Sequence, residues 1–261
     1  GESLTNVKCC RTFLWRIRWV LTSGTNLQLG PAKKMYNGKF ESGLGNSVPL
    51  KPDLGYNVEA RRLTMSVFDE LKQEIMADPM NQDYTDKGIE PLFSASKEAK
   101  MVIVGQAPGK KAEASRLFWN DLSGDRLREW MGISREQFYQ TDQIVHLPMD
   151  FYYPGKAKTG DKPPRKAFAK KWHPKILKQM PQVKTIVLVG SHAQEFYLGK
   201  DRKRNLTETV KNYQDYLPNY LPLVHPSPLN MGWLAKNPWF EKEVVPVLKN
   251  RVQEIMDGTA G

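Results

Sequence analysis

The chain holds few of the residues that build cross-linked or metal-centred proteins. Only two of its 261 residues are cysteines, and these two, Cys9 and Cys10, are adjacent. This excludes a disulfide framework and any zinc or iron–sulfur site that needs four cysteines. It favours a reducing, intracellular setting, which we take to be the cytoplasm. The four histidines show no metal-ligand spacing, so we expect neither a metal nor a cofactor.

Long apolar runs and nucleotide-binding glycine patterns are also missing. No apolar run approaches the roughly 20 residues that span a bilayer, so we expect no membrane partner. Neither the dinucleotide fingerprint nor the P-loop spacing of glycines occurs. Apolar residues nevertheless make up 40 % of the chain, which argues against wholesale disorder. A chain of this length can bury one large core, or a domain with an appendage.

The charge of the chain is strongly positive. The net charge is +11, which points to a polyanionic partner or an anionic surface. Residues 1–64 hold ten Lys and Arg against four Asp and Glu, so residues 65–261 keep a net charge of only +5. About half of the argument from charge therefore depends on the first 64 residues.

Residues 1–64 are expected to be a basic N-terminal extension that is poorly structured or not native. From residue 22 to 57 they are rich in Gly, Pro, Asn and Ser without a clear period. The aromatic, basic segment 13–21 is compatible with a strand, an amphipathic surface segment or part of a transit peptide. Because the chain begins with Gly1 and Met65 opens a helix signal, an alternative is that the natural product starts at Met65.

Residues 65–261 show the pattern of a single α/β domain. Ser66 and Asp69 form a capping-box pattern that predicts a helix start. Short apolar runs predict four strands, at 101–104, 143–147, 185–189 and 221–224. Helices are expected at 123–131, 164–180, 192–198, 206–216 and 238–256, the last with a kink at Pro246. Strands buried on both faces and separated by helices predict a three-layer α/β/α sandwich with a four-stranded parallel sheet.

Three of the predicted strands are followed by unusual loops. Residues 105–109 read Gly-Gln-Ala-Pro-Gly, residues 190–191 read Gly-Ser, and residues 225–229 read His-Pro-Ser-Pro-Leu. Ligands gather at the carboxyl ends of strands in such sheets, and the prolines hold the histidine loop in a fixed shape. The plain alternatives are a strand-to-helix connection, a helix cap at Ser191 and a buried histidine in a proline-rich turn.

Taken in this order, the three loops resemble those of the uracil-DNA glycosylase superfamily. The similarity also takes in Phe118 and covers about residues 65–252. Three further segments, 123–130, 160–164 and 237–240, resemble a bacterial branch of the superfamily that lacks an iron–sulfur cluster. The resemblance implies an enzyme that flips a base out of DNA and breaks its N-glycosidic bond.

The resemblance also implies roles for single residues. His225 matches the donor that stabilises the departing base anion, and Gln106 would hold a base carbonyl or orient water. Phe118 would stack on the flipped base, and Leu229 would fill the gap in the duplex. The remaining pocket residues would be Gly105, Ala107, Pro108, Gly109 and His146, and Ser191, Pro226, Ser227 and Pro228 would contact the DNA backbone.

Two positions depart from the pattern of the active families. Gln106 and Ala107 stand where a carboxylate or an asparagine positions the attacking water, and an amide cannot act as a base. No asparagine ends the second strand, so His146 and Asp150 are the nearest polar substitutes. One hypothesis is that Asp150 turns inward and supplies the missing carboxylate. The target base is left open, because a specific amide contact decides which base is accepted.

Other polar features have milder explanations. His173 precedes Pro174 and is expected on a helix surface, while Asn205 is expected to cap a helix. A basic stretch is either a solvated face or a track for the DNA backbone; it comprises Lys156, Lys158, Lys162, Arg165, Lys166, Lys170 and Lys171.

The sequence therefore predicts a monomeric DNA base-excision glycosylase acting on uracil or another deaminated base. One alternative is a nucleic-acid-binding protein that keeps the fold without hydrolysing the bond. Another is a hydrolase of free nucleosides or nucleotides.

Overall fold

The computed structural model describes residues 35–36, 39–40 and 65–259. Two short strands, β1 (Met35–Tyr36) and β2 (Lys39–Phe40), pair antiparallel. The expectations for the other residues up to 64, including segment 13–21, fall outside the described residues. Residues 65–259 belong to one compact unit, and the account below concerns this unit.

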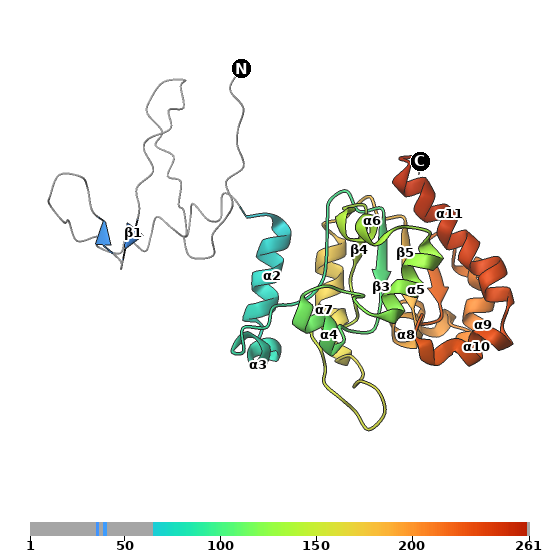
Figure 1. Ribbon diagram of the computed structural model, residues 1–261, viewed down its shortest axis with the longest axis horizontal. Coiled ribbons are helices and arrows are strands. Elements are labelled where there is room, and N and C mark those ends of the chain that lie inside the picture. Colours follow the sequence, from blue (N-terminus) through green and yellow to red (C-terminus); the bar gives the residue numbers. More distant parts are fainter. Residues whose placement is uncertain (1–34, 37–38, 41–64, 260–261) are drawn as a thin grey trace, which may run out of the picture. The chain divides into compact units, whose positions relative to one another are not determined.

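Four parallel strands form the central sheet. They are β3 (Met101–Val104), β4 (Ile144–His146), β5 (Thr185–Val189) and β6 (Tyr220–Leu223), in the order β4-β3-β5-β6 (Figure 1). The register pairs Ile103 with His146 and Val104 with Leu188. All four predicted strands are confirmed; two have the predicted bounds, and the other two differ by one residue at each end.

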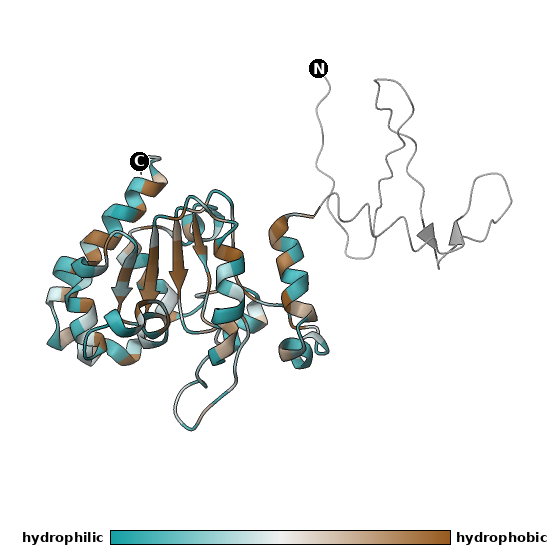
Figure 2. Cartoon of the chain, turned by 180° about the vertical axis from the view of Figure 1, so that it is seen from behind, coloured by the Kyte–Doolittle hydropathy of each residue, from teal (hydrophilic) through white to brown (hydrophobic). Residues whose placement is uncertain are grey.

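Alternate side chains of the strands enter two separate cores, as the period of two in a strand requires. Met101 and Ile103 pack on one face with Leu127 and Leu248, and the neighbouring side chain of Val102 packs on the other face. Figure 2 shows the strands as the hydrophobic centre between helices. The predicted three-layer α/β/α sandwich is therefore confirmed.

Helices cover both faces of this sheet. The α-helices are α2 (Val67–Ala77), α3 (Gln82–Thr85), α4 (Lys110–Ser115), α5 (Leu122–Met131), α6 (Arg135–Gln140), α7 (Lys166–Leu177), α8 (Ser191–Leu198), α9 (Leu206–Lys211), α10 (Met231–Lys236) and α11 (Val245–Met256). Short 3₁₀ turns lie at Pro79–Asn81, Gly199–Asp201, Tyr213–Tyr216 and Pro228–Asn230.

The predicted helices are confirmed in place and altered in length. The helix expected at 206–216 ends early and continues as a 3₁₀ turn. The expected kink at Pro246 appears as a π-helical turn, Phe240–Val244, after which α11 starts with the proline in its first turn, where the missing N–H costs nothing. Helices α3, α4, α6 and α10 were not predicted.

Two predicted helix caps are confirmed, whereas the predicted position of one histidine is wrong. Ser66 and Asp69 form the predicted capping box, and the Asn205 side chain accepts a hydrogen bond from the Glu208 N–H at 2.9 Å. The prediction that His173 lies on a helix surface is wrong, because the residue is buried. Its Nε2 lies 2.9 Å from the Pro148 carbonyl oxygen and its Nδ1 lies 2.7 Å from the Tyr197 hydroxyl. The carbonyl can only accept, so Nε2 carries the proton.

Candidate active site

A cavity of about 490 Å³ lies where the strands of the sheet end. The loop after β3 and the loop after β6 both line it, although more than a hundred residues separate them in the chain. Of the site residues predicted from the sequence, ten line this cavity: Gly105, Gln106, Ala107, Pro108, Gly109, Phe118, His146, Ser227, His225 and Leu229.

The first loop is held by the segment that follows β4. The Met149 N–H donates to the Gly105 carbonyl at 2.9 Å, and the Asp150 N–H donates to the Gln106 carbonyl at 3.2 Å. A Cβ atom at Gly105 would lie 2.9 Å from the Trp119 ring, so the close approach of this ring requires a glycine. The Gln106 side-chain amide donates to the Lys162 carbonyl at 3.3 Å, which ties the loop to the basic stretch.

The last loop is fixed by its own hydrogen bonds. The Asn230 side-chain amide donates to the His225 carbonyl at 2.8 Å, and the Ser227 hydroxyl accepts from the Leu229 N–H at 3.2 Å. Prolines at 226 and 228 restrict the backbone further. The Leu229 side chain is 91 % exposed, so this ordered turn presents a bare leucine to solvent.

His225 lines the cavity and is partly buried. Its ring centroid is 5.6 Å from that of Trp119. Burial lowers the pKa of His225, and the negative charge of Asp121 partly opposes this shift. The imidazole is therefore neutral at pH 7, and one of its ring nitrogens carries a proton that it can donate.

These observations are matched by a comparison with known families. The family model described as the uracil DNA glycosylase superfamily matches residues 93–249. The chain belongs to this superfamily. The match spans all four strands of the central sheet and both loops that line the cavity, and it supports a glycosylase type of reaction on DNA.

At the base of the cavity of this superfamily member, His146 is packed among aromatic rings. Its ring lies 4.2 Å from Phe118 and 4.6 Å from Phe138, centroid to centroid. Burial lowers the pKa of His146 to about 3, and the charge of Arg128 adds to this effect. Neither ring nitrogen has a hydrogen-bond partner among the described residues. A neutral histidine with two free ring nitrogens thus lies where the sequence lacks the asparagine.

The hypothesis that Asp150 supplies the missing carboxylate does not fit this geometry. Asp150 is fully buried and does not line the cavity. Its Oδ2 accepts from Arg165 Nε at 2.7 Å and its Oδ1 accepts from Arg165 Nη2 at 2.8 Å. The backbone N–H groups of Tyr152 and Arg165 also donate to this carboxylate. All of its strong acceptor positions are occupied, so it has none left to orient a water molecule.

Three other predicted residues do not line the cavity: Ser191, Pro226 and Pro228. Ser191 is not a cap either, because Gly190 takes the N-cap position of α8 and no side-chain cap bond forms. A Cβ atom at Gly190 would lie 3.8 Å from the Cβ atom of His225, so the Gly190–Ser191 turn adjoins the histidine loop. The sequence motifs alone could not show which of their residues line the cavity and which only lie beside it.

The structure adds cavity residues that sequence reasoning missed, chiefly Trp119 and Asp121. Asp121 caps α5, since its Oδ1 accepts from the Gly124 N–H at 2.9 Å. An aspartate before a helix was a visible capping signal, but nothing in the sequence placed it beside His225. Trp119 has a positive φ of 54°, uncommon for a bulky residue, and Arg128 Nη1 donates to its carbonyl at 3.1 Å. No sequence pattern predicts that backbone conformation.

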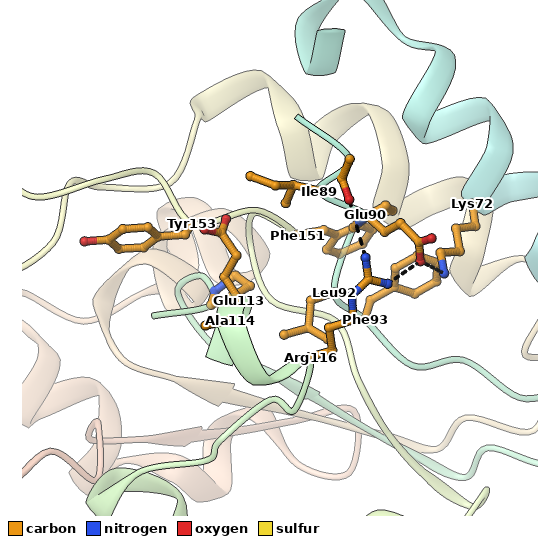
Figure 3. Close-up of a pocket in the computed structure, with 13 residues that line it drawn as sticks. Lys72, Ile89, Glu90, Leu92, Phe93, Glu113, Ala114, Arg116, Phe151 and Tyr153 are labelled. Carbon is orange, nitrogen blue, oxygen red and sulfur yellow. Dashed lines mark hydrogen bonds and ion pairs between the residues drawn. The ribbon is translucent and has the colours of Figure 1, made fainter. Parts of the chain in front are cut away.

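A second cavity, of about 450 Å³, shares Pro108 with the lining of the first; most of its other lining residues are labelled in Figure 3. Three of its charged groups are paired, because the Glu90 carboxylate lies 2.6 Å from Lys72 Nζ and 2.7 Å from Arg116 Nη1. These two cations lower the pKa of Glu90. The buried Oε2 of Glu113, which also lines this cavity, has no hydrogen-bond partner among the described residues. Apart from Pro108 none of the predicted site residues lines this cavity, and we assign it no role in the chemistry.

Within residues 35–36, 39–40 and 65–259, no cluster of three or more His, Cys, Asp or Glu side chains is placed to hold a metal ion. None of the helices described there has the length and apolar character to cross a bilayer.

Proposed function

We propose that the protein is a DNA base-excision glycosylase that hydrolyses the N-glycosidic bond of uracil or another deaminated base flipped out of DNA. The observation that carries the proposal is the meeting of the Gln106 and His225 loops around one cavity. Flipping is needed because the bond cannot be reached inside a stacked duplex.

His225 acts on the leaving group. As the glycosidic bond breaks, negative charge develops on a base oxygen, and a fixed N–H donor in a water-poor site stabilises that charge. The lowered pKa of His225 suits a neutral donor at pH 7. Water then adds to the sugar carbon and loses a proton, and the released base anion takes up a proton, so that the two transfers balance.

Asp121 serves the sugar side of the reaction in place of the missing carboxylate. Its Oδ1 is held by the Gly124 N–H, which fixes the orientation of the carboxylate at the cavity. The second oxygen would accept a hydrogen bond from the attacking water and support the positive charge that develops on the sugar. Gln106 contributes an amide that can orient the same water or hold a base carbonyl.

The base would lie against Phe118 and Trp119, with His146 beneath it. Aromatic faces stack on any base, so they bind without selecting one. Both ring nitrogens of His146 are buried, so a contact with the edge of the base would require the aromatic rings around it to shift.

Contacts to the DNA backbone complete the proposal. The Ser191 turn and the loop with Pro226, Ser227 and Pro228 would contact phosphates, and Leu229 would enter the base stack. The lysines of the basic stretch would add a salt-dependent attraction. A monomer acting in the cytoplasm, without metal or cofactor, is part of this proposal.

The test is an assay with labelled single- and double-stranded oligonucleotides that carry uracil, hypoxanthine, xanthine or a mismatched thymine. We expect abasic sites with at least one base, and a loss of about 100-fold or more in His225→Ala and Asp121→Asn. Asp215→Asn is the control, because Asp215 pairs only with surface Lys203. Salt-sensitive binding without product would make the protein a binder, and cleavage of free nucleosides alone would make it a nucleosidase.

A further inference from the structure

The exposed large hydrophobic side chains gather around the mouth of the cavity. In the described part of the chain they are Leu117, Leu122, Leu229 and Met231. Leu229 lines the cavity, and each of the other three is next in sequence to a residue that does. An exposed apolar group confined to the rim of a site marks a contact surface.

Leu122 is the most exposed of these after Leu229, with 69 % of its surface accessible. It is the first residue of α5, and its neighbours Asp121 and Ser123 both line the cavity. Leu122 itself does not line the cavity, so its side chain lies at the rim and points away from the cavity. Since Asp121 caps the helix, the backbone that carries Leu122 is held in place.

The side of α5 that carries Leu122 faces the loop that carries Leu229. Residues four apart lie on one face of a helix, so Leu122 and Arg126 share a face. Arg126 Nη1 lies 3.4 Å from the Ser227 carbonyl oxygen, two residues before Leu229. Two ordered leucines, one from α5 and one from the last loop, therefore stand beside the same section of the rim.

We propose that Leu122 and Leu229 together form a two-leucine wedge that enters the base stack of double-stranded DNA where the nucleotide is extruded. This inference rests on the proposed function and assigns a DNA-contacting role to α5. Apolar side chains that enter a base step unstack it and hold the strand open. The cations at the same rim, Arg126 and Lys111, suit a DNA strand better than an apolar protein surface.

The experiment compares Leu122→Ala, Leu229→Ala, the double variant and Leu122→Met on matched single- and double-stranded substrates. Asp215→Asn is the control, because Asp215 pairs with surface Lys203 and does not line the cavity. A 2-aminopurine placed next to the lesion reports unstacking by its fluorescence. We expect the rate of base release by Leu122→Ala to fall about ten-fold on duplex DNA and less than about two-fold on single strands. The rise in 2-aminopurine fluorescence on duplex DNA should also be weaker than with the wild type.

Leu122→Met should retain most of the duplex rate, because it keeps the apolar bulk. Equal losses on both substrates, or an unchanged duplex rate and fluorescence in Leu122→Ala, would overturn the wedge. If the wild-type protein releases no base from any of these DNA substrates, the proposed function is wrong. In that case the 2-aminopurine signal on binding still decides whether Leu122 opens the duplex.

Discussion

Replacing Asp150 with asparagine removes the negative charge from a fully buried ion pair. The carboxylate accepts two hydrogen bonds from the Arg165 guanidinium, at 2.7 and 2.8 Å, and further bonds from two backbone N–H groups. Loss of one partner of a buried pair costs about 3–5 kcal/mol. The Arg165 side chain is 28 % exposed and water can partly solvate it, so we expect about 3 kcal/mol, at the lower end of this range.

Urea titration and thermal unfolding measure this loss directly. For a domain of this size, about 3 kcal/mol lowers Tm by roughly 6–12 °C. The matched control is Asp215→Asn, which breaks the exposed pair with Lys203 and should change the stability by less than about 1 kcal/mol. An Asp150→Asn variant that keeps wild-type stability and yet loses activity would contradict this prediction. Asp150 would then act in the chemistry.

Three further changes test the packing around the site. Burial lowers the pKa of His173 to about 4, so the unfolded chain binds the proton first, and stability should fall as pH drops from about 6.5 to about 4. Urea titrations across this range should show a shallower fall in His173→Gln, and equal slopes would contradict the buried neutral imidazole. Ser66→Ala removes the α2 capping box and should cost about 1 kcal/mol of unfolding free energy, with no effect on the rate of base release. A Cβ atom at Gly124 would lie 1.8 Å from the Trp119 carbonyl oxygen, so Gly124→Ala should cost about 1–3 kcal/mol or more and slow base release; wild-type values for both would refute this contact.

The strands and their loops could be predicted because they depend on local patterns. Buried parallel strands read as short apolar runs, and glycine and proline mark the turns after them. The capping roles of Ser66 and Asn205 were also visible, since a cap involves residues only three apart.

The errors arose where distant parts of the chain meet. Asp150 pairs with Arg165, and His173 is buried and bonds to the Pro148 carbonyl. No local sequence pattern indicates either contact. Trp119 reaches the cavity only because its backbone adopts a positive φ that Arg128 supports. The position of Asp121 at the cavity and the buried contacts of Asp150 and His173 could therefore be seen only in the folded chain.

The order of the sheet has a consequence for how the protein gains activity as it folds. The loops with Gln106 and His225 follow β3 and β6, and β5 lies between these two strands. The walls of the cavity can come together only after β5 has joined its neighbours on both sides. Pairings between such distant strands form slowly, so during refolding helical signal should return before base release does. The time course of regained catalysis would then report the completion of the sheet.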